Sequence, residues 1–109
     1  MISFEDFQKV DIRVGRILDV ELLPNSKYTT HKLTIDLGDE LGKKTSCARV
    51  IRYGNEELIG RLVLCVVNMP PRQIGKTMSE VLTLGVPDGT GECSLVKPCS
   101  DVPLGGKLY

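Results

Sequence analysis

Hydrophobic residues alternate with polar ones along several short stretches of the chain, which is the pattern of strands that bury one face. In 32–37, three apolar residues alternate with three polar ones. The stretch 11–23 alternates too, but its phase slips near Gly15. This slip predicts a long strand with a bulge or sharp bend at that glycine. A long, bent first strand suits a small closed barrel, because one strand then serves both ends of the curled sheet.

Four further strands and two short helices are expected along the chain. Residues 61–68 form a near-continuous apolar run, which is typical of a strand buried on both faces. Helices are expected after Ser3, which can cap with Asp6 three positions on, and at 55–60, where Asn55 can be the cap. The other strands are expected at 44–50, 76–86 and 92–97, with a loop at 69–75 and turns at 24–26 and 38–42.

The order of these elements is strand, strand, strand, helix, strand, strand, with additions at both ends. A helix between the third and fourth of five barrel strands is the arrangement of the OB-fold. We therefore expect 1–109 to form one all-β domain: a five-stranded OB-fold barrel with a short helix between strands 3 and 4, an N-terminal helix and C-terminal strand additions. The alternative from pattern alone is an SH3-like barrel.

The charge of the chain is balanced, with 14 basic and 14 acidic residues. Zero net charge argues against strong non-specific binding to nucleic acid, which needs an excess of cations against phosphates. The basic residues are nevertheless concentrated, because 43–76 contains seven of them and only two acids. A neutral protein can therefore present one basic face, although a segment of chain need not be a face of the fold.

Catalysis and metal binding have little support in the sequence. The four cysteines contain no C-x-x-C pair, and His31 is the one histidine, so neither a zinc site nor any other cofactor is expected. We expect reduced thiols, with Cys65 in the core, and a surface position in a turn for His31. Nucleophile-elbow and phosphate-loop motifs are missing, so the protein is not expected to be an enzyme.

No apolar stretch approaches the ~20 residues that cross a bilayer, and the acidic N-terminus does not resemble a secretory signal. A cytoplasmic location is therefore expected, with no insertion into a membrane.

Residues 11–17 (D-I-R-V-G-R-I), 68–74 (N-M-P-P-R-Q-I) and 79–80 (S-E) resemble three motifs of the tRNA-binding OB domain. This domain occurs in free-standing proteins and is appended to some methionyl- and phenylalanyl-tRNA synthetases. The resemblance is narrower to the CsaA-type proteins, through residues 4–7 (F-E-D-F), 79–85 (S-E-V-L-T-L-G) and 102–106 (V-P-L-G-G). It covers nearly the whole chain.

The resemblance implies a homodimer of OB barrels, joined through the terminal additions, that binds tRNA by its shape and backbone. For the CsaA branch it also implies a chaperone role in export, with unfolded preproteins and the secretion motor ATPase as partners. Two departures from the synthetase-linked domains favour this branch. Ser46-Cys47-Ala48 stands where those domains carry S-G-[IL], and Val81-Leu82 stands where they carry G-M. The alternative is a free-standing tRNA-binding module or a synthetase-associated factor without a chaperone role.

Candidate ligand-binding residues share a position near the expected 69–75 loop or the barrel rim: Ser46, Arg52, Asn68, Arg72, Lys76 and Ser79. Arg72 follows two prolines that fix its loop, and its planar fork suits bidentate contact with phosphate. The alternatives are a solvated surface arginine, a structural turn amide at Asn68 and structural hydroxyls at the two serines. With five aromatic residues and no tryptophan, the chain suits folded RNA better than stacked single strands.

Overall fold

The computed structural model describes residues 1–23 and 30–109, so the expected turn at 24–26 lies outside the described residues. The helices are α1 (Phe4–Gln8) and α2 (Asn55–Leu58). The strands are β1 (Ile12–Leu23), β2 (Thr30–Asp36), β3 (Lys43–Ala48), β4 (Leu62–Val66), β5 (Arg72–Ile74), β6 (Thr77–Ser79), β7 (Leu82–Thr83), β8 (Gly85–Pro87) and β9 (Cys93–Leu95).

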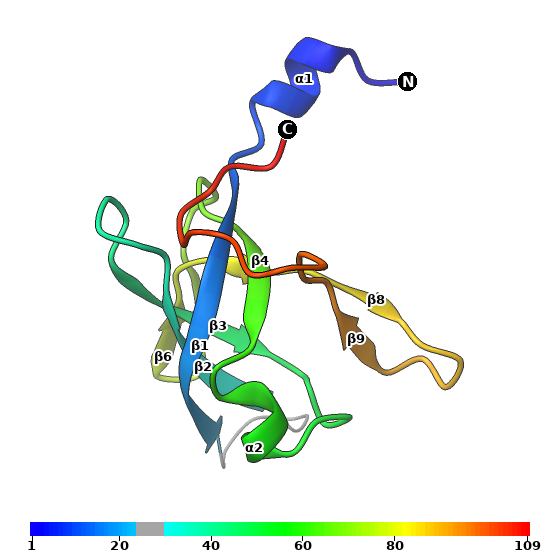
Figure 1. Cartoon of the computed structure of the whole chain (residues 1–109). Helices are drawn as coiled ribbons and strands as arrows, with labels where there is room; N and C mark the ends of the chain where they lie inside the picture. The colour runs from blue at the N-terminus through cyan, green and yellow to red at the C-terminus, as the bar shows by residue number, and fades with distance from the viewer. Residues whose placement is uncertain (24–29) are drawn as a thin grey trace.

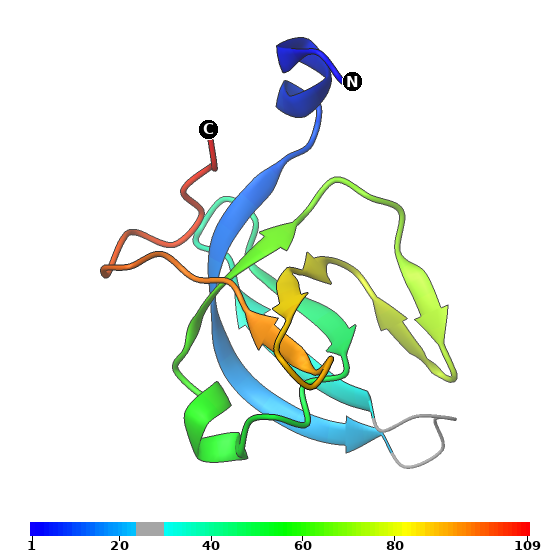
Figure 2. The ribbon, with the colours of Figure 1, turned by 90° about the vertical axis from the view of Figure 1, so that its right-hand side faces the viewer.

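Five antiparallel strands form one curled sheet in the order β3-β2-β1-β4-β7, with α2 between β3 and β4 along the chain (Figures 1 and 2). The segment between β6 and β7 closes the sheet against β3. The Glu80 amide donates to the Thr45 carbonyl at 2.7 Å, and the Cys47 amide donates to Ser79 Oγ at 2.9 Å. The predicted all-β, OB-like barrel is confirmed.

Hydrophobic residues are buried on both faces of the middle of the sheet, as the apolar run of β4 predicts. All five residues of β4 are buried. Inside the barrel, Ile17, Ile35 and Val63 belong to the main core. Outside it, a second cluster on β1 and β4 is covered by the C-terminal segment, which runs beside β1 through hydrogen bonds from the Gly105 amide to Val14 and from the Leu108 amide to Ile12.

The irregularity in β1 lies at a different residue from the one expected. The register with β2 shifts between Ile17 and Asp19, whereas Gly15 pairs regularly with β4. A Cβ on Gly15 would lie 2.5 Å from a methyl carbon of Ile35 and 2.8 Å from one of Leu37. The glycine is therefore required by close packing inside the barrel, and the bulge belongs to the residue that follows Ile17.

Four other local expectations were wrong. The expected 69–75 loop contains β5, which forms a hairpin with β6, and the expected strand 76–86 is divided among β6, β7 and β8. Gly54, and not Asn55, is the N-cap of α2. His31 lies buried in β2, because it occupies an inward position of that strand.

The N-terminal helix stands away from the barrel at the end of the molecule where the C-terminus also lies (Figures 1 and 2). Its capping box is as predicted, with the Asp6 amide donating to Ser3 Oγ and the Ser3 amide donating to the Asp6 carboxylate, both at 3.1 Å. None of its residues is buried, and Phe4 is 71% exposed. Within the two described stretches of chain, no helix has the length and apolar character needed to cross a membrane.

Candidate nucleic-acid interface

A groove with a volume of about 440 Å³ runs between the outer face of β2 and β3 and the β5–β6 hairpin. Its lining comes from both sides: Lys32, Thr45, Pro71, Lys76, Thr77, Met78 and Glu80. Concave sites of several hundred Å³ are the usual form of ligand-binding surfaces, and the β2–β3 face is the face on which OB barrels bind their ligands.

The alternation of β2 places cationic and hydroxyl side chains on the outer face of the barrel. Leu33 and Ile35 point into the core, so Lys32 and Thr34 point outward. Thr34 is paired with Thr45 and Lys32 with Cys47 on β3, and directly paired residues lie on the same face. One wall of the groove is therefore polar and contains Lys32.

The β5–β6 hairpin forms the other wall. Its two-residue turn, Gly75-Lys76, joins Ile74 to Thr77, and Gly75 adopts a φ of +61° that suits glycine. Lys76 is thus exposed at the tip of the hairpin. Arg72 is paired with Ser79, whose hydroxyl contacts β3, so Arg72 lies on the side of the hairpin that faces the barrel.

The Cys47 thiol, on β3, lies within the electrostatic influence of Lys32 on β2 and Arg72 on the hairpin. Burial raises the pKa of Cys47, while the Ser79 hydroxyl and the positive charges of Lys32 and Arg72 act in the opposite direction. The thiol is therefore neutral near pH 7, and its environment contains a cation from each wall. Glu80 brings a negative charge to the same groove, but its carboxylate accepts the Thr45 amide at 3.0 Å and so substitutes for a ladder hydrogen bond.

Of the six residues predicted to bind ligand, Lys76 lines the groove, and Arg72 is exposed on the same hairpin but lines a neighbouring cavity of about 90 Å³. Ser46 and Ser79 are nearby but buried. Ser46 accepts a hydrogen bond from the Thr83 hydroxyl at 2.8 Å, and Ser79 joins β3 to the hairpin. These hydroxyls hold strands together, which is the structural alternative.

Asn68 and Arg52 lie outside the groove. The Asn68 side chain accepts the Asp11 amide at 2.9 Å and donates to the Lys9 carbonyl at 2.7 Å, so it clamps the segment between α1 and β1. Arg52 lies 3.5 Å from Asp88 and 5.7 Å from the centroid of the Tyr53 ring. Its charge is therefore opposed by a carboxylate on another side of the barrel.

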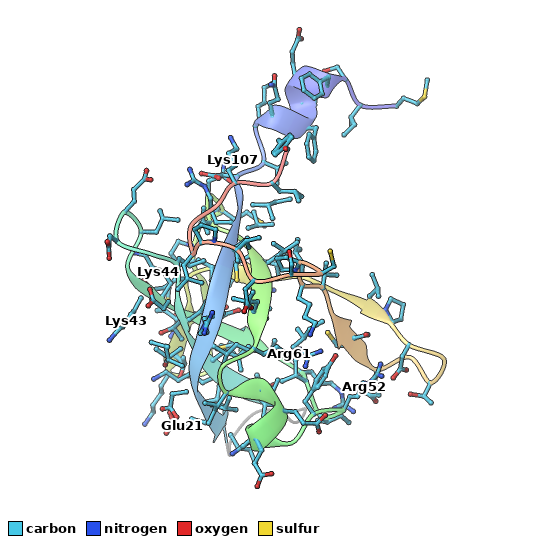
Figure 3. All side chains as sticks on the ribbon, viewed as in Figure 1. Glu21, Lys43, Lys44, Arg52, Arg61 and Lys107 are labelled. Carbon is cyan, nitrogen blue, oxygen red and sulfur yellow. The ribbon has the colours of Figure 1, made fainter. Side chains whose placement is uncertain are left out.

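The basic residues of 43–76 do not form one face. Figure 3 shows Lys43 and Lys44 on one side of the sheet and Arg52 and Arg61 on the other. The groove instead recruits Lys32, which precedes the basic segment and was missed by the sequence reading. The alternation of β2 could have revealed this residue, because the buried Leu33 places the adjacent Lys32 on the outer face.

Comparison with known proteins places the chain in a family. The family model described as a putative tRNA binding domain matches residues 12–107. Methionine–tRNA ligases of Porphyromonas gingivalis and Pyrococcus furiosus are each 34% identical over 108 residues, or 98% of this chain. The chain spans about 15% of the length of these relatives.

The solved structures that match the whole chain include two CsaA proteins. The CsaA chaperone protein of Picrophilus torridus has a TM-score of 0.94 at 41% identity, covering 100% of both chains. Chaperone CsaA of Bacillus anthracis has a TM-score of 0.91 at 40% identity, covering 100% of this chain and 99% of that one. The resemblance inferred from the sequence motifs is confirmed, and the chain belongs to the tRNA-binding domain family.

Proposed function

We propose that the protein binds tRNA, and that the groove between β2–β3 and the β5–β6 hairpin is where the RNA backbone lies. The observation that carries this proposal is that Lys32 and Lys76 line one cavity of about 440 Å³ from its two walls, while Arg72 is exposed on the same hairpin beside a neighbouring cavity of about 90 Å³. Among the described residues, none of these three has a carboxylate within 4 Å except Lys32, which lies 3.9 Å from Glu21. Cations without close carboxylates can neutralise phosphates at little cost.

The chemistry of the groove favours folded RNA that is recognised through its backbone. Arginine and lysine bind phosphate oxygens, and Thr45 and Thr77 add hydroxyls at the lining. No aromatic ring lines the groove as the structure describes it, so successive bases have nothing to stack on. A structured RNA, whose bases are already stacked, does not need such rings.

Binding of tRNA at graded salt concentrations tests this proposal, using the natural protein with Lys76→Glu and Lys107→Glu. Both lysines are exposed, but Lys107 lies beside the C-terminus, away from the hairpin (Figure 3). We expect the affinity of the natural protein to fall with salt, and the log–log slope to become shallower by about one for Lys76→Glu only. Absence of binding at low salt would contradict the function, and equal effects of the two variants would contradict the groove.

We further propose that the protein is a dimeric, cytoplasmic, non-enzymatic chaperone of the CsaA type, acting on unfolded preproteins and with the secretion motor ATPase. Similarity to CsaA chaperones over the whole chain supports this second role. Apolar side chains without a covering segment support the dimer: Ile2 is 74% exposed and Phe4 71%. Such residues at one end of the molecule require a partner surface.

The dimer is tested by light scattering of the natural protein and of Phe4→Ser at micromolar concentration. We expect about twice the chain mass of 12.0 kDa for the natural protein and one chain mass for the variant. Leu22→Ser is the control and is expected to remain dimeric. Leu22 is also exposed and apolar, but it lies near the C-terminal end of β1, far from α1. A natural protein of one chain mass would refute the dimer.

The chaperone role is tested separately, by the aggregation of a denatured preprotein diluted into buffer with and without the protein. Slower aggregation supports it, and unchanged aggregation together with intact tRNA binding leaves a free-standing tRNA-binding module. Recovery of a tRNA synthetase with the protein in a pull-down would instead support the synthetase-associated alternative.

A further inference from the structure

A second cavity, of about 490 Å³, lies between the turn that precedes β4 and the segment that follows β9. Residues 57 and 59–62 form one wall, and residues 97–101 form the other. It shares no lining residue with the groove at the β5–β6 hairpin. Both ribbon views place α2, at the first wall of this cavity, and the β5–β6 hairpin on different sides of the barrel (Figures 1 and 2).

Arg61 contributes a guanidinium that is held in place. Its Cζ lies 4.6 Å from the centroid of the Tyr53 ring. Tyr53 is itself fixed, because it is buried and its hydroxyl accepts the Leu95 amide at 3.0 Å. Arginine stacked on an aromatic face has lost much of its side-chain freedom before a ligand arrives, so binding costs less entropy.

This guanidinium has no anionic partner within the described parts of the chain. Its Nε is buried without a hydrogen bond, and no carboxylate lies within 4 Å of its nitrogens among the residues placed by the structure. Two neighbouring arginines differ, since Arg49 lies 3.3 Å from Glu92 and Arg52 lies 3.5 Å from Asp88. Figure 3 shows Arg52 and Arg61 on the same side of the molecule.

The remaining lining groups define what else a ligand must carry. Lys97 supplies a second cation and Ser100 a hydroxyl. Glu57 and Asp101 supply carboxylates, of which Glu57 already accepts the Gly54 amide at 3.1 Å. A site with two cations and two acids suits a ligand that carries both an anion and hydroxyl donors.

We propose that this cavity binds a sugar phosphate of about mononucleotide size, with the phosphate on Arg61 and Lys97 and the sugar hydroxyls on Glu57 and Asp101. Arginine binds phosphate through a bidentate fork, and carboxylates commonly accept from ribose hydroxyls. A volume of about 490 Å³ is in the range of small-molecule sites. The same chemistry is offered by a free ribose phosphate and by the phosphorylated 5′ end of an RNA.

Titration of the isotope-labelled natural protein with ribose 5-phosphate, followed by NMR, tests this inference. We expect shifts of the Arg61 side-chain Nε signal and of the amides of 97–101 at millimolar ligand. Lys97→Gln is expected to weaken binding at least about tenfold, or ~1.4 kcal/mol, and Lys107→Gln to leave it unchanged. Arg61→Gln should do the same as Lys97→Gln, but the exposed Lys97 is the decisive variant because its loss leaves the Tyr53 packing intact.

Two short oligoribonucleotides, one with a 5′-phosphate and one with a 5′-hydroxyl, identify the source. If the 5′-phosphorylated oligonucleotide causes the same shifts and the 5′-hydroxyl oligonucleotide does not, the site is assigned to an RNA end. If ribose 5-phosphate causes the shifts and neither oligonucleotide does, the site is assigned to a free metabolite. The inference is overturned if neither ligand moves these signals, if sodium chloride at equal ionic strength moves them equally, or if Lys97→Gln binds normally. Loss of binding in Arg72→Gln/Lys76→Gln would also overturn it, because the ligand would then lie in the groove.

Discussion

Two hairpins leave the barrel, and they handle charge in opposite ways. The β5–β6 hairpin presents Arg72 and Lys76, for which the described structure contains no carboxylate within 4 Å. The β8–β9 hairpin presents acids, Asp88 and Glu92, which pair with Arg52 and Arg49. A chain of zero net charge can therefore keep a cationic surface on one hairpin, because the acids of the other hairpin pair with Arg49 and Arg52.

The comparison also shows why the position of a charge along the chain is a weak guide to its role. Arg52 and Arg72 belong to the same basic segment of sequence, and both were predicted to bind ligand. In the fold, Arg52 joins the β8–β9 hairpin to the loop before α2, whereas Arg72 is exposed on the β5–β6 hairpin with no carboxylate within 4 Å among the described residues. Charge available to a ligand is set by the partners of each side chain.

The largest expected effect comes from neutralising the two hairpins in turn. Arg72→Gln/Lys76→Gln removes two cations from the β5–β6 hairpin, and should reduce the salt slope of tRNA binding by about two and the affinity at low salt on the order of a hundredfold. Arg49→Gln/Arg52→Gln removes the same charge from the other side and should change the slope much less. Filter binding at several salt concentrations measures the slopes of both double variants. Equal slopes would contradict the proposed difference between the two hairpins.

A smaller effect is expected from the hydroxyl that attaches the β5–β6 hairpin to the barrel. Ser79→Ala leaves the buried Cys47 amide without its acceptor, and an unsatisfied buried donor costs about 2 kcal/mol. Urea denaturation should show this loss in the free energy of unfolding. Ser94→Ala, on β9, is the control and should cost little. Unchanged stability of Ser79→Ala would mean that the hairpin is held by other contacts.

The fold could be predicted from the sequence because its main strands bury one face or two. The alternation in 32–37 and the apolar run in 61–68 survive as β2 and β4 with shifted ends. The β5–β6 hairpin was missed because Pro70 and Pro71 indicate a loop, and the turn signal of Gly75 was read as its end. Short strands outside the main sheet bury little and so leave little pattern.

The site was only partly predictable, because its residues act through partners far away in sequence. Arg72 was identified from a motif and Lys76 as a further cation beside it; both are exposed, and their role in binding stays a prediction. Asn68 belongs to the same motif, but its side chain contacts the amide of Asp11, 57 positions earlier. Ser46 is buried among residues from other strands. No local pattern reveals which motif residues already use their polar atoms in such contacts within the protein.

The smallest expected effect concerns the pKa of Asp88, in the β8–β9 hairpin, and its contribution to stability. Hydrogen bonds from the Thr90 hydroxyl and amide and from the Glu92 amide, together with the charge of Arg52, lower the pKa of Asp88 below its ordinary value of 3.8. A lowered carboxyl pKa contributes stability that is present above the unfolded pKa and lost as pH falls through the folded pKa. Asp88→Asn should therefore have a lower Tm than the natural protein at pH 6, and the difference should shrink below pH ~4.

Removal of the Thr90 hydroxyl separates the contribution of hydrogen bonds to the lowered pKa of Asp88 from the contribution of the Arg52 charge. Thr90→Val deletes the hydroxyl that lies 2.7 Å from Asp88, and should raise the midpoint of the Asp88 carboxyl titration followed by NMR. Arg52→Gln should raise it less, because the arginine is the weakest of the groups that lower this pKa. A larger effect of Arg52→Gln would show that the β8–β9 hairpin depends on its ion pairs. An external phosphate could then compete for Arg52, and the contrast with the β5–β6 hairpin would be weaker.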